Sequence, residues 1–82
     1  MIGLKYSLVI EATEDPSFFC FYSPDLPGFS GVGHSIEDCV YKGRWGMEEH
    51  TGLMAASGMT APKPRRRPRI VIQDAATLKR AG

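Results

Sequence analysis

The chain has 82 residues, of which 43% are hydrophobic and 23% are charged, and its formal net charge is +1. This length suits one domain, and the small core of such a domain favours stabilisation by a partner subunit. The near-zero net charge argues against a domain that binds nucleic acid over its whole surface. No apolar stretch approaches the roughly 20 residues of a membrane-spanning helix, and the first residues lack a signal-peptide pattern. We therefore expect a soluble, cytoplasmic protein.

Period-two alternation of apolar residues predicts a first strand over Leu4–Ala12. After a short polar connection, the aromatic run Phe18–Tyr22 predicts an antiparallel partner strand. The corner Pro24–Gly28, with the sequence Pro-Asp-Leu-Pro-Gly, must end that strand because each proline fixes φ and lacks a donor N–H. A short third strand over Phe29–His34 then completes an antiparallel meander.

A helix is predicted over Ser35–Ser57, with Ser35 as the N-cap and Gly58 as the C′ residue. Its apolar residues recur at helical spacing and form a stripe that packs on the sheet. Gly43 and Gly46 lie on or beside this stripe. Their small size would let the helix and the sheet approach closely.

Residues 59–68 form a linker rich in proline and arginine, and Arg69–Asp74 predicts a fourth strand. The crossover is long enough to join parallel strands. The fold class is α+β, with a three-stranded antiparallel sheet, one long helix packed on it, and a fourth strand after the linker (β-β-β-α-β). Residues 1–74 make up this domain, and residues 75–82 form a C-terminal tail of at most two helical turns.

Cys20 and Cys39 are the only cysteines, and the sequence favours two buried free thiols over a disulfide. His34 and His50 lie about four helical turns apart, so they cannot share a metal ion. No close zinc-ligand spacing occurs. We expect no metal and no cofactor.

The corner is predicted to be exposed, so Asp25 and Leu26 are candidate partner contacts. For Asp25 the alternative is turn chemistry, in which its carboxylate accepts from nearby backbone N–H groups. Trp45 falls off the apolar stripe of the helix and is a third candidate contact, because interfaces favour exposed tryptophan. The alternative for Trp45 is packing at the sheet edge or in a homodimer.

The run Arg65, Arg66 and Arg67 is the one clear charge cluster. It could dock an acidic partner or contact nucleic-acid phosphates, or it could be a solvated linker. Acidic residues suggest a further alternative, a minimal two-metal nuclease site in which several carboxylates converge. The carboxylates considered for that site are Glu11, Asp25, Glu37, Glu48 and Asp74.

Over about Leu4–Asp74, the chain resembles the HicB antitoxin family. The segments that carry this resemblance are Tyr6–Glu11 (YSLVIE), Tyr22–Gly28 (YSPDLPG), Ser35–Cys39 (SIEDC), and Gly58 with the Pro62-Lys63-Pro64 run. The family typically shows a Thr-Leu-Glu-Glu-Ala pattern at the third of these. His50 departs from the family pattern, which usually has an apolar residue at that position of the helix.

The resemblance implies a truncated ribonuclease-H-like fold without nuclease activity. It also implies binding to HicA, a small toxin similar to double-stranded-RNA-binding domains that cuts mRNA with its own histidine. Many family members add a C-terminal helix-turn-helix or ribbon-helix-helix domain, for which Ala75–Gly82 is too short. DNA binding by this chain alone is therefore not expected.

These observations predict a protein-binding module, not an enzyme, that neutralises a HicA-like toxin by masking it. Short strands with open edges also predict a homodimer or a higher homo-oligomer. Two alternatives stay open. One is the metal-dependent nuclease, and the other is an orphan ligand- or nucleic-acid-binding domain without a toxin.

Overall fold

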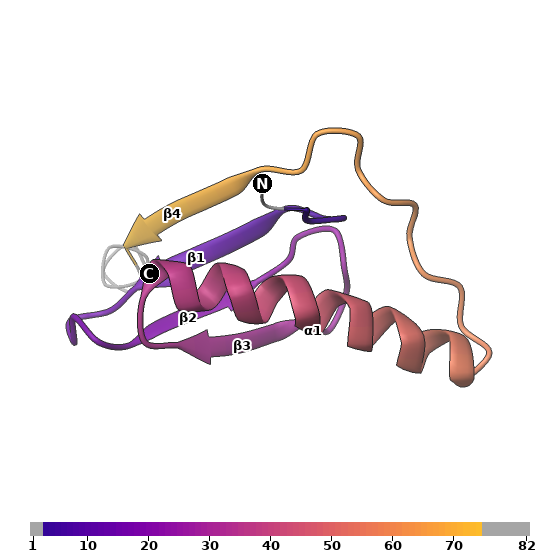
Figure 1. The fold of residues 1–82 in the computed structure, drawn as a ribbon, viewed down its shortest axis with the longest axis horizontal. Helices are drawn as coiled ribbons and strands as arrows, with labels where there is room; N and C mark the ends of the chain where they lie inside the picture. Colours follow the sequence, from indigo (N-terminus) through magenta and orange to yellow (C-terminus); the bar gives the residue numbers. More distant parts are fainter. Residues whose placement is uncertain (1–2, 75–82) are drawn as a thin grey trace, which may run out of the picture.

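The structure is a computed structural model that describes residues 3–74. It confirms the α+β class and the predicted order of elements (Figure 1). The predicted tail over 75–82 lies outside the described residues. Within residues 3–74, no helix combines the length and the apolarity needed to cross a bilayer. The elements are β1 (Leu8–Ala12), β2 (Phe19–Tyr22), β3 (Ser30–Gly33), α1 (Ile36–Ala56) and β4 (Ile70–Asp74).

All four strands form one mixed sheet in the order β3-β2-β1-β4. The pairs β1–β2 and β2–β3 are antiparallel, whereas β4 runs parallel to β1 with Leu8 opposite Ile70. Figure 1 shows α1 lying across one side of the sheet, and the linker returning from the end of α1 to place β4 beside β1. The three-stranded meander of the prediction is thus extended by a parallel strand on its β1 side.

Both ends of α1 are capped as the sequence predicts. The Ser35 side chain accepts from the backbone N–H of Asp38 at 2.9 Å, which satisfies one free donor of the first turn. At the other end, Gly58 adopts a φ of 77°, a left-handed conformation that glycine tolerates. The Met59 N–H then donates to the Met54 carbonyl at 2.8 Å, which completes a Schellman-type end.

Glycines on the inner side of α1 allow the predicted close approach to the sheet. A Cβ atom at Gly43 would lie 2.9 Å from Leu8 Cδ2, and one at Gly46 would lie 2.9 Å from Phe29 Cε1. The core between helix and sheet therefore has no room for a side chain at either position. The buried core residues are Leu4, Tyr6, Leu8, Ile10, Phe21, Leu26, Phe29, Cys39 and Met47.

The first strand is shorter than predicted and begins at Leu8, although the apolar residues before it are still buried. Backbone groups ahead of Leu8 are paired with other parts of the chain. The Ser7 N–H donates to the Asp25 carboxylate at 2.9 Å, and the Lys5 carbonyl accepts from the Arg65 N–H at 2.8 Å. Because these groups already have partners, the segment bends toward the linker and the corner instead of extending the sheet.

Candidate partner-binding surfaces

The proline corner is packed against the domain, and the prediction that Leu26 lies on an exposed contact surface is wrong. Leu26 has 0% exposure and belongs to the core. The corner folds back toward α1, where the Pro27 carbonyl lies 3.1 Å from His50 Nε2. An apolar side chain held between two rigid prolines is buried by this turn, so Leu26 contributes to stability and cannot contact a partner in this conformation.

Asp25 is also engaged inside the domain. Its side chain is only 14% exposed, and one carboxylate oxygen accepts from both the Ser7 N–H at 2.9 Å and Arg65 Nε at 2.8 Å. Partial burial tends to raise the pKa of this carboxyl. The hydrogen bonds from Ser7 and Arg65 outweigh that effect and hold the pKa below its usual value. Asp25 therefore ties the corner to the segment just before β1 and to the linker, a longer-range role than the turn chemistry considered from the sequence.

Replacing Asp25 with alanine should destabilise the fold by about 2 kcal/mol near pH 7, because a backbone N–H loses its charged acceptor. Because the pKa of Asp25 is lower in the folded state, its contribution is complete above the unfolded pKa of about 4. The contribution disappears as the pH falls through the lower folded value. Urea unfolding of wild type and Asp25→Ala at pH 7 and below pH 3 measures both effects.

Arg65→Ala is the matched control for that experiment, since the Arg65 side chain is 58% exposed. We expect it to cost less than about 1 kcal/mol, because water and salt screen an exposed ion pair. Equal losses for Asp25→Ala and Arg65→Ala would contradict the view that the Ser7 hydrogen bond dominates. If wild type and Asp25→Ala differed in stability by the same amount below pH 3 as at pH 7, the conclusion that folding lowers the pKa of Asp25 would be contradicted.

The linker is extended but fixed to the domain. The Tyr6 hydroxyl donates to the Pro62 carbonyl at 2.6 Å, and the Arg69 N–H donates to Ser7 Oγ at 3.0 Å. Together with the Arg65 contacts, these bonds hold both ends of the arginine run in place. The interpretation of this run as a freely solvated linker is therefore wrong for its backbone.

The arginine side chains line an open hollow of about 890 Å³ beside the start of β1 and β4. Arg65, Arg66 and Arg67 of the prediction lie there together, and Arg69 joins them. Within residues 3–74, only Arg65 of these four forms an ion pair. Sequence reasoning missed Arg69 because it was assigned only to a strand, although the Arg-Arg-Arg-Pro-Arg spacing carried the signal. The other lining residues are Ser7, Val9, Pro24 and Val71.

This hollow opens onto the face of the sheet that points away from α1, here called the open face. Side chains alternate along each strand, and residues paired across strands share a face, so the pairings place Val9, Tyr22 and Val71 together on it. No helix or strand within residues 3–74 lies on this face (Figure 1). The residues that the four strands contribute to the open face are Val9, Glu11, Cys20, Tyr22, Ser30, Val32, Val71 and Gln73.

The outer side of α1 carries the second candidate surface, here called the aromatic helix face. Tyr41 is 65% exposed and Trp45 is 53% exposed, and their rings meet edge to face with centroids 6.4 Å apart. The Arg44 guanidinium lies 5.1 Å from the centroid of the Trp45 ring. Glu48 and Glu49 border the same shallow hollow. Trp45 thus does not pack at the sheet edge, and it remains available to a partner.

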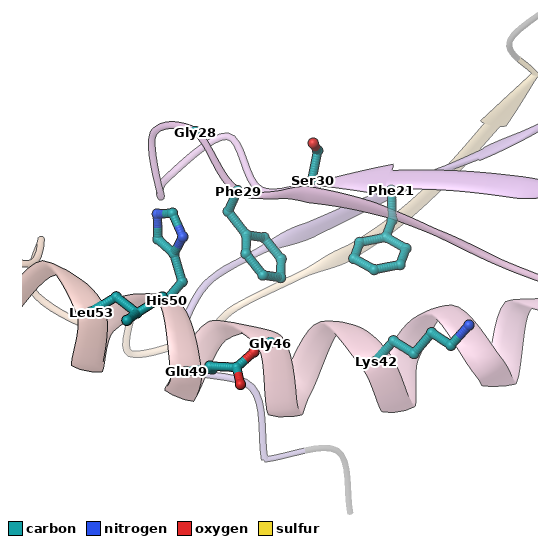
Figure 2. Close-up of a pocket in the computed structure, with 9 residues that line it drawn as sticks. All are labelled: Phe21, Gly28, Phe29, Ser30, Lys42, Gly46, Glu49, His50 and Leu53. Atoms are coloured by element: carbon teal, nitrogen blue, oxygen red, sulfur yellow. The ribbon is translucent and has the colours of Figure 1, made fainter.

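A smaller hollow of about 240 Å³ lies between α1 and the turn at Gly28, and Figure 2 shows the side chains around it. The His50 ring is directed toward that turn and stands edge-on to Phe29, with centroids 5.8 Å apart. Lys42 and Glu49 project from α1 at separate points and do not converge on His50. The hollow contains ionisable groups, but it does not assemble them into an acid–base arrangement.

The carboxylates of the nuclease alternative are scattered. Glu11 accepts from Gln73 Nε2 at 3.0 Å, and Glu48 lies 3.6 Å from Lys5 Nζ. Among residues 3–74, no group of three or more histidine, cysteine, aspartate or glutamate side chains could hold a metal ion. Both cysteines are free, and burial raises the pKa of the Cys39 thiol, which keeps it in the unreactive neutral form.

The predicted contact residues fall into separate groups. Asp25 and Arg65 meet directly, whereas Trp45 lies on α1, on the other side of the sheet from the arginine hollow. Comparisons of the chain with protein-family models, curated proteins and solved structures found no match. The two exposed surfaces differ in chemistry, because the aromatic helix face carries charges of both signs, whereas the arginine hollow is lined by apolar and basic side chains.

Proposed function

We propose that this chain is a HicB-like antitoxin module of the cytoplasm that neutralises a HicA-type mRNA-cleaving toxin by binding and masking it. The observation that carries the proposal is the exposed Tyr41–Trp45 pair on the aromatic helix face. The family resemblance supplies the identity of the partner. The contact surface is inferred from the exposed residues of the domain.

Exposed tryptophan and tyrosine are the residue types that most often dominate binding energy at protein interfaces. Tyr41 and Trp45 are one helical turn apart, and their mutual contact limits the freedom that each would lose on binding. Gly52 lies further along the outer side of α1, where a Cβ atom would meet nothing within 4 Å. The aromatic pair is therefore accessible to a partner that lies along the helix.

Charge favours the aromatic helix face over the arginine hollow for a basic toxin. The aromatic helix face carries both signs of charge, because Glu48 and Glu49 lie beside Trp45 together with Lys42 and Arg44. Within residues 3–74, Glu49 forms no ion pair and is available to a basic partner. The arginine hollow would repel a basic protein, because like charges brought together at an interface are unfavourable. The proposed mechanism is occlusion, in which this chain covers the catalytic histidine of the toxin and performs no reaction itself.

Co-expression with the product of the adjacent reading frame tests the proposal, which expects a small basic protein there. We expect the two proteins to co-purify, and we expect Trp45→Ser to weaken the complex at least about 30-fold, since such anchors contribute 2 kcal/mol or more. Leu53→Ser is the matched control, because Leu53 is an exposed apolar residue of α1 outside the aromatic pair. Equal weakening by both variants, or no complex with wild type, would contradict the proposed surface.

The metal-dependent nuclease is the alternative from a different class. Incubation of this chain alone with labelled RNA and Mg²⁺ or Mn²⁺ separates the two functions. We expect no cleavage above background. Cleavage that disappears in Glu11→Ala or Asp74→Ala would replace the binding proposal with the enzymatic one.

A further inference from the structure

We propose that the open face of the sheet is the contact surface between two copies of this chain, which pack face to face about a two-fold axis. In this arrangement, the arginine hollow of each copy lies over the acidic end of the other. The inference concerns a different side of the domain from the proposed toxin contact. It therefore stands or falls independently of the antitoxin function.

The first observation is an apolar sheet surface without cover. Tyr22, Val32 and Val71 are among the exposed large apolar residues, and all three lie on the open face. A sheet with one face packed on a helix normally has a polar alternation on its other face. Here each strand places one large apolar residue on this face, and three of the four, in β2, β3 and β4, are exposed to water. Exposed apolar residues in neighbouring strands favour packing on a second layer.

The second observation is that charge is separated along the strands. Arg66, Arg67 and Arg69 lie at the end where β1 and β4 begin. Glu11 lies on the open face near the end of β1, and Glu14 follows in the loop between β1 and β2. Figure 1 shows this loop and the arginine-bearing linker at opposite ends of the sheet.

A two-fold axis parallel to the interface and perpendicular to the strands satisfies both observations. Such an axis reverses the strand direction of the second copy, so its acidic end faces the arginines of the first. The same contact then occurs twice, as in every isologous dimer. The exposed side chains of Tyr22 and Val71 meet their own symmetry-related copies and leave water, whereas Val9 between them is already buried in the single chain.

A second copy explains this surface better than the other occupants. Single-stranded RNA could use the arginines and stack on Tyr22, but the same face ends in Glu11, which repels phosphate. Pairing through the edge of β4 would extend the sheet but would leave the apolar open face in water. If two copies paired through their β4 edges, the exposed Ile72 of β4 would lie near the contact. Val32 lies on β3 at the opposite edge of the sheet and would not take part.

Sedimentation equilibrium of wild type and two single variants tests whether the open face forms the contact between the two copies. Val32 is 51% exposed on the open face, and Ile72 is 52% exposed on the side of the sheet that carries α1. Val32→Lys should raise the dimer dissociation constant at least about tenfold, because it places a charge in the apolar contact. Ile72→Lys is the matched control and should leave that constant within about threefold of wild type.

A charge exchange tests the two-fold arrangement. The experiment uses two double variants, Arg66→Glu/Arg67→Glu and Glu11→Arg/Glu14→Arg. Each variant alone should be monomeric, because like charges would then face each other at both ends of its homodimer. An equimolar mixture should recover the dimer, since each variant end then faces an opposite charge. Far-UV circular dichroism of each variant is the control for folding.

Three results would overturn the proposal. They are a wild type that stays monomeric up to about 1 mM, a dissociation constant that responds to Ile72→Lys but not to Val32→Lys, and a charge-exchange mixture that stays monomeric. Tight binding of a labelled single-stranded RNA by a monomeric wild type would reassign the arginine hollow to nucleic acid.

Discussion

Leu26→Ala is expected to destabilise the domain by about 3 kcal/mol, one of the largest effects of a single substitution in this chain. The Leu26 side chain is fully buried and packs in the core between the sheet and α1. Its truncation removes apolar contacts and leaves a cavity that two flanking prolines prevent from closing. For a domain of this size, the melting temperature should fall by roughly 12–24 °C.

Leu26→Met is the control for this substitution, because it nearly conserves volume and should cost less than about 1.5 kcal/mol. Urea or thermal unfolding followed by circular dichroism measures both variants. If Leu26→Ala is as stable as wild type, the corner does not insert into the core and the contact role predicted from the sequence would be restored. If the variant is unfolded, Leu26→Val gives a smaller loss of the same sign.

Gly43→Leu should be about 3 kcal/mol less stable than Gly52→Leu, although both place the same side chain on the same helix. A side chain at Gly43 meets Leu8 within 3 Å, so the helix must move away from the sheet. At Gly52 nothing lies within 4 Å, and the substitution should stabilise the helix by up to about 1 kcal/mol. The difference isolates packing from helix propensity.

Chemical unfolding of the two glycine variants, each compared with wild type, checks this expectation. Gly52→Leu also adds an apolar side chain to the outer side of α1, so the protein concentration is held low to avoid association. Equal stability of Gly43→Leu and Gly52→Leu would show that helix and sheet are further apart than the structure places them.

The sequence predicted the order of elements because local signals are strong in this chain. Period-two alternation marked β1, the prolines marked the end of β2, and Ser35 and Gly58 marked the ends of α1 to within one residue. The small inner residues of α1 also predicted close packing on the sheet, and Gly43 and Gly46 confirm it. Each of these features depends on residues near one another in the chain.

The candidate sites were harder to predict because they depend on distant contacts. The corner reads locally as an exposed turn, yet Asp25 bonds Ser7 and Arg65, which lie 18 and 40 residues away. Leu26 is buried for the same reason, since the corner packs against a helix that local patterns do not place beside it. Trp45 was identified because its offset from the apolar stripe is a local property of the helix.

A titration of RNA cleavage tests the proposal that this chain masks an mRNA-cleaving toxin. The adjacent-frame protein is held at a fixed concentration with labelled mRNA, and this chain is added in steps. We expect cleavage to stop at one copy of this chain per toxin, with Trp45→Ser shifting inhibition to higher concentration. Undiminished cleavage in the presence of excess folded wild type would contradict the claim.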